Sequence, residues 1–206
     1  MPVKYLDASQ LACLLIDTLL GLAASRQTAI IVALDGPDCS GKTTLAREFL
    51  TQGKGRASIA LAHFDDYLNE KSFRLRQGEF SAVGFREDYF DFDAFADGFL
   101  EHAKRAKMRS DITKPHLFIA EGLFLQDKRL FSYFDYVIRL DASDELILRR
   151  AIARDVGVIG DESWVSRHYL EQCLPAQRAY REEVDPTKGA LVTAFACDDG
   201  LYAVDC

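Results

Sequence analysis

The residues best suited to chemistry lie in one segment, 36–43, which fits the pattern G-x-x-x-x-G-K-[ST]. An apolar run of strand type (29–34) precedes it, and a helix-type segment (44–50) follows. The glycines let successive backbone N–H groups face a phosphate chain, and the following helix presents its N-terminal dipole to the same anion. Lys42 is expected to reach the β- and γ-phosphates, and Thr43 to ligate Mg²⁺. The expected ATP contacts are Gly36, Asp38, Cys39, Ser40, Gly41, Lys42, Thr43 and Thr44.

Acidic residues follow two other apolar segments. Asp65 and Asp66 come after 57–62, where a carboxylate could accept the proton of an attacking hydroxyl in a phosphotransferase. Asp65 is the favoured base, and either acid could also contact Mg²⁺ through water. Glu121 follows the apolar segment 117–120, a pattern typical of a Mg²⁺-coordinating acid. The predicted metal-associated residues are Thr43, Glu121 and Asp65.

Arginines gather on the expected helix 143–155. Arg150 and Arg154 are four residues apart and share a helix face beside the glycine break at 157–160. This pattern predicts a lid whose guanidinium groups close on the transferring phosphate. The alternative is a solvated helix face with ordinary ion pairs. Arg167 and His168 could belong to the same lid. The predicted catalytic residues are Asp65, Lys42, Arg150 and Arg154.

A long segment, 63–89, combines aromatic and basic side chains with little periodicity. Aromatic faces with polar groups suit a flat ring such as a nucleobase, and Asp91 is a candidate for holding sugar hydroxyls. The alternative is that the aromatics form a local core under a long loop, which is preferred for Phe85 and Phe92. The residues predicted to bind the acceptor are Asp66, Tyr67, Arg76, Asp91 and Arg167.

Strand and helix patterns alternate along the chain. Strands are expected near 29–34, 57–62, 116–120, 136–140 and 190–196, with an edge strand or tail at 202–204. Helices are expected at 44–52, 92–107, 143–155 and 164–183, the last kinked or divided at Pro175. Such alternation predicts an α/β three-layer sandwich with a central, mostly parallel sheet. Ligands then bind beyond the carboxyl ends of the strands.

Composition limits the remaining choices. The 206 residues predict one domain, in which 1–27 forms an amphipathic helix extension with a face of Leu11, Leu14, Leu15, Thr18, Leu19 and Leu22, and 150–183 forms the lid and following helices. The net charge of −7 argues against nucleic-acid and membrane partners. Five scattered cysteines indicate neither a disulfide framework nor a zinc site. An ATP-using enzyme with reduced cysteines is expected in the cytoplasm, and a homo-oligomer is left open.

Five motifs in order resemble the uridine kinase family of phosphate-loop (P-loop) kinases, which neighbours nicotinamide riboside kinase and phosphoribulokinase. They are the loop 36–43, Phe-Asp-Asp-Tyr at 64–67, Tyr-Phe-Asp-Phe-Asp-Ala-Phe at 89–95, Glu-Gly-Leu-Phe at 121–124, and the arginines from 149 to Arg154-Asp155. The chain is most similar to a bacterial uridine kinase-like branch. The resemblance implies that Asp65 is the base, Asp91 binds ribose hydroxyls and Glu121 is the Mg²⁺-associated acid. Arg150 and Arg154 then match the arginine-rich lid.

The resemblance further implies transfer of the γ-phosphate of ATP or GTP to the 5′-hydroxyl of a nucleoside, with uridine as the default acceptor. One departure is that 89–95 lacks the His-Pro that the family carries between its two aspartates. Alternative acceptors are a vitamin precursor or sugar, of the nicotinamide riboside, pantothenate or ribulose phosphate type. An alternative of another class is a regulatory nucleotide-binding ATPase, which would lack an acceptor pocket beside the γ-phosphate.

Overall fold

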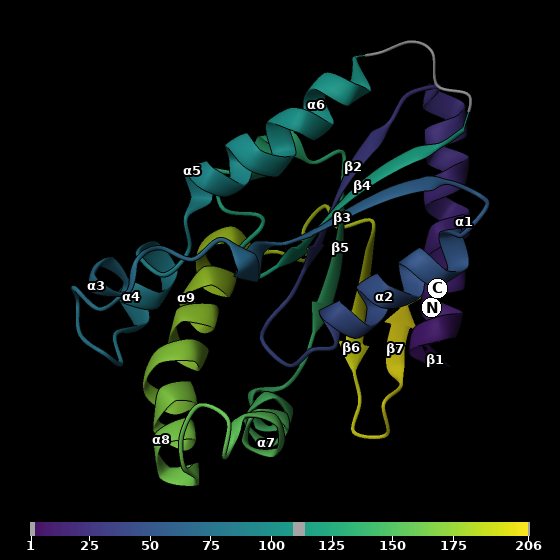
Figure 1. Ribbon diagram of the computed structural model, residues 1–206. Coiled ribbons are helices and arrows are strands. Elements are labelled where there is room, and N and C mark those ends of the chain that lie inside the picture. The colour runs from purple at the N-terminus through teal and green to yellow at the C-terminus, as the bar shows by residue number, and fades with distance from the viewer. Residues whose placement is uncertain (1–2, 109–113, 206) are drawn as a thin grey trace.

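A seven-stranded sheet forms the centre of the computed structural model, which describes residues 3–108 and 114–205 (Figure 1). Its strand order is β1-β7-β6-β5-β2-β4-β3. The strands are β1 (Val3–Leu6), β2 (Ile30–Asp35), β3 (Ser58–His63), β4 (His116–Gly122), β5 (Tyr136–Asp141), β6 (Val192–Ala196) and β7 (Tyr202–Asp205). The five strands from β6 to β3 are parallel, whereas β7 pairs antiparallel with both β6 and β1. The expected α/β architecture with a mostly parallel sheet is confirmed.

Helices cover both faces of this sheet, because β2 and β4 are apolar on both sides (Figure 1). On one face Ile30, Val32 and Leu34 belong to a core shared with α1 (Ala8–Arg26) and α2 (Lys42–Gly53). On the other face Ile31 and Ala33 belong to a second core. That core includes residues of α5 (Phe92–Phe95), the π-helix Ala96–Leu100, α6 (Glu101–Lys107), α7 (Asp144–Asp155) and α9 (Leu174–Val184).

The N-terminal helix α1 is a core helix in this fold. Asp7 caps it by accepting from the backbone of Gln10, in a capping box. By length and apolarity alone α1 could cross a membrane, but Leu11, Leu15 and Leu19 are fully buried in the core that it shares with α2 and the sheet. Leu14, which the sequence placed on the packed face, is instead 44% exposed.

Three further features differ from the sequence-based expectation. The strand at the C-terminal end, β7, is not an edge strand, since β1 pairs with its outer side and forms the edge. Strand β1 was not predicted, because four residues at a chain end give too short a pattern. The expected helix 164–183 is divided into α8 (Glu162–Arg167), the π-helix His168–Cys173 and α9. Pro175 stands in the first turn of α9, where its missing N–H leaves no hydrogen bond unmade.

The long aromatic segment after β3 folds into short pieces rather than one loop. These are the 3₁₀ turn Phe64–Asp66, α3 (Lys71–Arg74) and α4 (Ala82–Glu87); a further 3₁₀ turn, Phe131–Tyr133, precedes β5. An isolated bridge joins Leu68 to Phe90, so the segment closes on itself. The aromatic segment starts at the carboxyl edge of the parallel strands. The loop after β2 and the end of β4 lie at the same edge, where ligands of such sheets bind.

Candidate active site

The phosphate loop has the conformation that its glycines were expected to provide. Gly41 has a φ of 98°, a conformation that L side chains rarely adopt, and a Cβ there would lie 2.1 Å from the hydroxyl of Tyr202. A Cβ on Gly36 would lie 2.4 Å from the carbonyl oxygen of Leu140. The Lys42 ammonium lies back over the loop and donates to the carbonyl of Pro37 at 2.8 Å. Only glycine therefore fits at both ends of the loop.

A buried polar network fixes the end of β2, from which the loop begins. The carboxylate of Asp35, the last residue of β2, is fully buried and accepts from Arg139 at 2.8 Å, Gln126 at 3.0 Å and the Tyr180 hydroxyl at 3.1 Å. These partners come from β5, the segment after β4, and α9. A buried carboxylate is stable only when it is paired and hydrogen-bonded, so the network fixes where the loop starts.

Glu121, at the end of β4, lies beside the first turn of α2. Its carboxylate is 3% exposed and accepts from the Thr43 hydroxyl at 3.2 Å. It is also hydrogen-bonded to Nδ1 of His63, its register neighbour at the end of β3. Among the described residues no group of three or more His, Cys, Asp or Glu side chains could hold a metal alone. One hydroxyl and one carboxylate do fit Mg²⁺, which takes its remaining ligands from substrate phosphates and water.

Asp65 stands between the loop and the aromatic segment. Its side chain is solvent-exposed where it opens onto the cavities described below, although protein atoms enclose much of the rest of the residue. This enclosure raises the pKa of Asp65 to about 6, with Asp38 and Glu121 adding to the rise and Lys42 opposing it. A carboxylate with this pKa is mostly ionised at neutral pH yet basic enough to accept a proton from a hydroxyl.

Helix α7 brings two arginines to the same place. Ser143 caps the helix by accepting from the backbone of Leu146. Arg150 donates to the carbonyl of Cys39 at 2.9 Å and to that of Cys197 at 2.8 Å, so it joins the loop to the turn after β6. Arg154 is exposed on this helix and forms a two-point pair with Asp155, at 2.6 and 3.0 Å.

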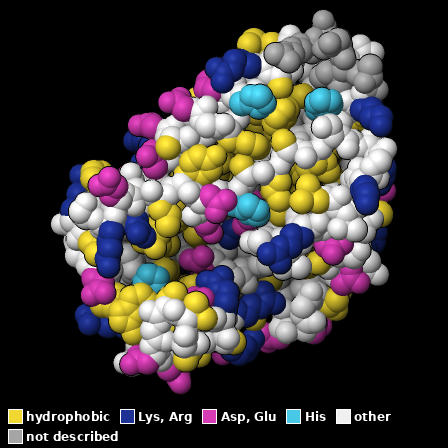
Figure 2. Space-filling model, viewed as in Figure 1, with side chains coloured by type: hydrophobic (Ala, Val, Ile, Leu, Met, Phe, Trp, Pro, Cys, Tyr) yellow, Lys and Arg dark blue, Asp and Glu magenta, His cyan; other side chains and the backbone are white. Residues whose placement is uncertain are grey.

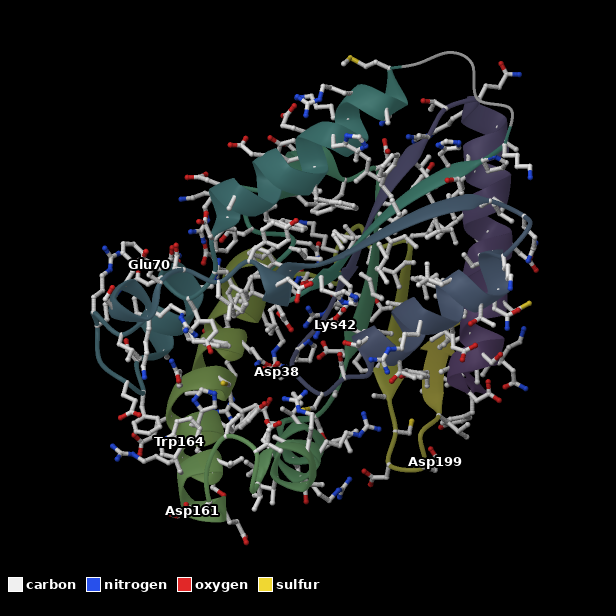
Figure 3. All side chains as sticks on the ribbon, in the orientation of Figure 1. Asp38, Lys42, Glu70, Asp161, Trp164 and Asp199 are labelled. Carbon is white, nitrogen blue, oxygen red and sulfur yellow. The ribbon has the colours of Figure 1, made fainter. Side chains whose placement is uncertain are left out.

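These groups surround a cavity of about 630 Å³. Figure 2 shows this face of the molecule hollowed at its centre, with acidic and basic side chains around the hollow. In Figure 3, Asp38 and Lys42 point into the centre, whereas Glu70, Asp161 and Asp199 lie at the periphery. The cavity, called here the nucleotide cavity, is lined by Ala8, Asp38, Cys39, Gly41, Lys42, Thr43, Thr44, Asp65, Glu121, Arg150, Arg154, Gly200 and Tyr202.

A second cavity of about 240 Å³, called here the acceptor cavity, adjoins the first. It is lined by Asp38, Asp65, Leu68, Phe85, Tyr89, Phe90, Leu123, Arg154, Asp155, Ile159, His168, Tyr169 and Cys173. Three residues, Asp38, Asp65 and Arg154, line both cavities. Most of the predicted phosphate and catalytic residues therefore meet at one place, and the junction of the cavities is acidic.

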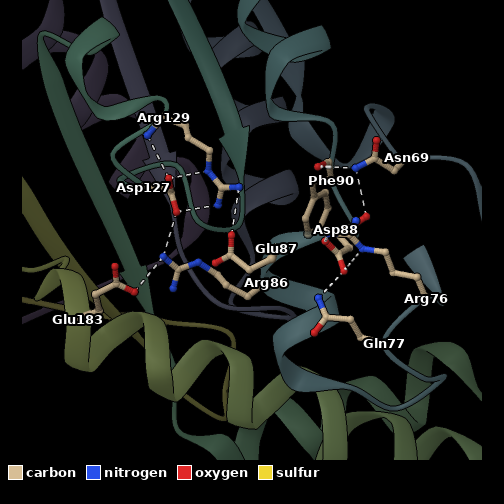
Figure 4. A network of polar contacts seen from close by, with 10 residues as sticks. All are labelled: Asn69, Arg76, Gln77, Arg86, Glu87, Asp88, Phe90, Asp127, Arg129 and Glu183. Carbon is tan, nitrogen blue, oxygen red and sulfur yellow. Dashed lines mark hydrogen bonds and ion pairs between the residues drawn. The ribbon is translucent and has the colours of Figure 1, made fainter. Parts of the chain in front are cut away.

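Polar contacts hold the aromatic wall of the acceptor cavity from outside (Figure 4). The buried Asp127 accepts from Arg86 and Arg129, each at 2.9 Å or less. Asp88 is buried and pairs with Arg76 on the far side of the same segment. The amide of Asn69 donates to the carbonyls flanking Tyr89, at 3.1 and 2.9 Å. The wall is therefore a built surface rather than a loose loop.

The five residues predicted to bind the acceptor line neither cavity. Asp91 caps α5 by accepting from the backbone of Ala94 at 2.8 Å, and Tyr67 packs edge-on against Phe95. Arg76 pairs with Asp88, Arg167 pairs with Glu171 on the protein surface, and Asp66 is exposed. Their binding roles stay predictions.

Sequence reasoning did not assign several residues that line the cavities. Tyr202 was expected in an edge strand or tail, and Tyr169 and Cys173 in a helix, without a role in a site. Phe85 does lie in the core, as expected, but also lines the acceptor cavity. His63 could have been found, because it ends the strand beside Glu121. Burial raises the pKa of Cys39 to about 11, so its thiol stays protonated at neutral pH.

Comparison with known proteins gives a consistent picture. The chain matches no protein-family model. It is 27% identical over 181 residues to a uridine kinase from Lactiplantibacillus plantarum, covering 77% of this chain and 82% of that protein. It is 29% identical over 177 residues to a uridine kinase from Limosilactobacillus reuteri, covering 77% and 79%.

Two solved structures share its fold. A possible uridine kinase from Bacillus stearothermophilus aligns with a TM-score of 0.57 at 20% identity, covering 87% of this chain and 98% of the other. A candidate fructose transport system kinase from Silicibacter sp. TM1040 aligns with a TM-score of 0.61 at 17% identity, covering 83% and 94%.

Proposed function

We propose that this chain, which belongs to the uridine kinase-like P-loop kinases, transfers the γ-phosphate of ATP to a hydroxyl group of a small metabolite. One observation carries the proposal: Asp65, the candidate base, lines the nucleotide cavity and the acceptor cavity at once. A kinase needs a base within reach of both the γ-phosphate and the acceptor hydroxyl, and the junction of the two cavities supplies that position.

The proposed reaction is an in-line displacement. The acceptor oxygen forms a bond to the γ-phosphorus, the bond from that phosphorus to the β-bridging oxygen breaks, and ADP leaves. Asp65 takes the hydroxyl proton, while Lys42 and the backbone N–H groups of the loop hold the phosphates. Thr43 and Glu121 would hold Mg²⁺, which neutralises phosphate charge when bound.

Arg154 is the proposed phosphate-stabilising arginine, since it lines both cavities. Its guanidinium is paired with Asp155 in the structure. Arg150 has a different role, because both of its terminal nitrogens are held by backbone carbonyls beside the loop. It shapes the loop, and its charge faces the phosphates from there.

A nucleoside is the default acceptor, supported by the names of the curated relatives. The acceptor cavity also favours a kinase over the rival regulatory ATPase, which needs no second cavity beside the γ-phosphate. A vitamin precursor or sugar remains the alternative acceptor. The proposal includes ATP and Mg²⁺, a cytoplasmic location, and neither nucleic acid nor membrane as partner, in keeping with the net charge of −7.

The test is an acceptor panel with Mg²⁺ and ATP, read by mass spectrometry for a product heavier by one phosphate. ADP release is measured with and without each acceptor. The proposal predicts product from at least one ring-bearing hydroxyl compound, with ADP release that depends on it. ADP release that is independent of every acceptor would contradict the proposal and favour the regulatory ATPase.

A further inference from the structure

The hairpin of β6 and β7 brings an aromatic side chain to the phosphate loop. Tyr202, the first residue of β7, is 5% exposed and lines the nucleotide cavity. A Cβ built on Gly41 would lie 2.1 Å from its hydroxyl and 3.2 Å from the ring carbon that bears the hydroxyl, so the polar tip of the side chain meets the loop. Gly41 is the N-cap of α2, the helix end whose N–H groups are expected to hold phosphate.

The hairpin is fixed against the loop. Strand β7 pairs with β6 on one side and with β1 on the other. The turn between β6 and β7 is closed by the backbone N–H of Cys197, which donates to the carbonyl of Leu201 at 2.8 Å. Arg150 joins this turn to the loop, because it donates to the carbonyls of both Cys197 and Cys39. The Tyr202 hydroxyl is thus held in one place by the fold itself, and such preorganisation favours binding.

The N-terminal segment supports the tyrosine from the outer side of β7. Leu6, the last residue of β1, stands opposite Tyr202 in the register, and both pack in the core that α1 and α2 share with the sheet. Ala8, the first residue of α1, also lines the nucleotide cavity. The segment that precedes the loop therefore forms part of the wall that positions this side chain.

The Tyr202 hydroxyl has no hydrogen-bond partner among the residues that the structure describes. Tyrosine hydroxyls buried to this degree usually find one. Two tyrosines of similar burial do so: Tyr169 donates to Asp155 at 3.0 Å, and Tyr180 donates to Asp35 at 3.1 Å. The exception lies at the wall of the nucleotide cavity, which indicates that a ligand supplies its partner.

The partner of this hydroxyl must be a hydrogen-bond acceptor. Burial raises the pKa of Tyr202, so its hydroxyl is protonated and can donate at neutral pH. The charged group that acts on this pKa is Arg150, a cation, which lowers it. None of the three described carboxylates in the cavity lining accepts from the hydroxyl. Three loop carbonyls already accept from other groups: Pro37 from Lys42, Cys39 from Arg150, and Gly41 from the backbone of Leu45.

We propose that Tyr202 is a nucleotide-binding residue whose hydroxyl donates a hydrogen bond to a phosphate oxygen of the bound triphosphate. This inference rests on the triphosphate-binding part of the proposed function and adds a ligand from outside the loop pattern. The phosphates are the part of a nucleotide that the N-cap end of α2 is expected to hold, so they bring acceptors to the hydroxyl. A hydrogen bond to a charged acceptor is stronger than one to a neutral acceptor, so its loss is measurable.

The experiment compares Tyr202→Phe, which removes only the hydroxyl, with Tyr5→Phe. Tyr5 lies on the neighbouring strand β1, is 62% exposed and lines neither cavity, so its variant makes the same chemical change outside the site. Calorimetry measures the affinity for a non-hydrolysable ATP analogue with Mg²⁺. Tyr202→Phe should bind it about tenfold more weakly than the wild type, which corresponds to about 1.4 kcal/mol. Tyr5→Phe should bind it as the wild type does. Equal affinity in the wild type and Tyr202→Phe would overturn the inference.

Two further measurements separate a phosphate contact from a structural role. Without ligand, Tyr202→Phe should melt at the wild-type temperature, because its hydroxyl bonds nothing in the fold. With saturating analogue, phosphorus NMR should show at least one phosphate resonance displaced between the wild-type and Tyr202→Phe complexes, and none displaced in Tyr5→Phe. A lower melting temperature of unliganded Tyr202→Phe, or weaker binding with all phosphate resonances unchanged, would overturn the inference.

Phosphate transfer by the same proteins keeps this inference apart from the proposed function. An ATP affinity that depends on the Tyr202 hydroxyl, in a protein that transfers phosphate to no acceptor, would contradict the proposed function and leave the inference standing. Transfer by the wild type, with the same KM for ATP in Tyr202→Phe, would leave the kinase proposal standing and overturn the inference.

Discussion

The two adjoining cavities are built in different ways. Six of the thirteen residues that line the nucleotide cavity come from one contiguous segment, 38–44. The loop that contains this segment has two glycines that cannot be replaced without a close contact. The acceptor cavity is formed by side chains from the segment after β4, from the aromatic segment, from α7 and from the helices after α7. We propose that backbone N–H groups bind phosphate in the nucleotide cavity and that side chains contact the ligand in the acceptor cavity.

This difference in construction determines how far the residues of each cavity can be substituted. A phosphate cradle made of backbone N–H groups depends on loop geometry and tolerates little change. A cavity lined by side chains can be altered one residue at a time while the scaffold stays in place, which is how related folds accept different ligands. Asp38, Asp65 and Arg154 line both cavities, so a substitution at any of them alters both.

The largest expected effect is at the shared base. Asp65→Asn should lower kcat for phosphate transfer by about 10²–10⁴-fold while leaving the affinity for ATP nearly intact, because the amide cannot accept the proton. The neighbouring Asp66→Asn should lose far less, since Asp66 lines neither cavity. Steady-state kinetics with nucleotide affinity by calorimetry checks both. Equal losses of kcat in the two variants would show that Asp65 is not the base.

The second effect is at the shared arginine. Arg154→Ala should lower kcat by about 10²–10³-fold with little change in the KM for ATP, as expected when a group acts on charge that develops during transfer. Arg149→Ala, on the same helix but paired with Asp198 and outside both cavities, is the matched control. A rise in the KM for ATP alone would make Arg154 an ordinary nucleotide contact.

The third effect is confined to the nucleotide cavity. Gly41→Ala should weaken ATP binding by roughly tenfold or more, because a left-handed L-residue costs about 1–2 kcal/mol and the added Cβ meets the Tyr202 hydroxyl. Gly55→Ala also places a side chain at a positive φ, but outside both cavities and in open space, so it is the control and should leave ATP binding unchanged. Calorimetry of both variants with Mg²⁺ and ATP measures the difference. Comparable losses of ATP affinity in the two variants would show that the loss does not arise in the loop.

The fourth effect is a pH dependence at the junction. The pKa of Asp65 is raised to about 6, and only its ionised form accepts a proton. The kcat/KM for the acceptor should therefore be level above pH 7 and fall by about tenfold per unit below pH 6. A profile that stays level down to pH 5 would contradict the role of Asp65.

The smallest effect is on stability. Because the folded-state pKa of Asp65 lies above the ordinary aspartate value of 3.8, ionisation is disfavoured in the folded protein. The cost is fully present above pH 6 and disappears as the pH falls below 4. Asp65→Asn should thus raise the melting temperature at pH 7.5 and have no effect at pH 4. A lower melting temperature at pH 7.5 would indicate that the charge stabilises the fold.

The nucleotide cavity could be predicted from the sequence because its determinants are local. The loop pattern and the acid after β3 each follow an apolar strand, and the acid Glu121 ends the apolar run of β4. Parallel strands bring these ends together. Of the predicted phosphate contacts, Gly36 and Ser40 do not line the cavity, because both are buried under the loop. They shape the loop instead, Ser40 by donating to the Pro37 carbonyl.

The acceptor cavity could not be predicted in the same way, because tertiary packing decides which side chains face it. Phe85 and Phe90 are in the core and at the cavity wall at once, and no pattern in the sequence distinguishes the two. Polar residues such as Arg76 and Asp91 look available in the sequence, but each is engaged by a local partner. The order of β1 and β7 was missed for a related reason, since strand pairing across a whole chain leaves no local signal.

The central claim is that one carboxylate serves both cavities. A crystal structure with Mg²⁺, a non-hydrolysable ATP analogue and an accepted hydroxyl compound tests it most directly. The account predicts the triphosphate on the loop 36–43, the ring between the aromatic walls, and the reacting hydroxyl within about 2.6–3.2 Å of the Asp65 carboxylate. An acceptor bound elsewhere, or a reacting hydroxyl beyond reach of Asp65 with both ligands in place, would contradict it.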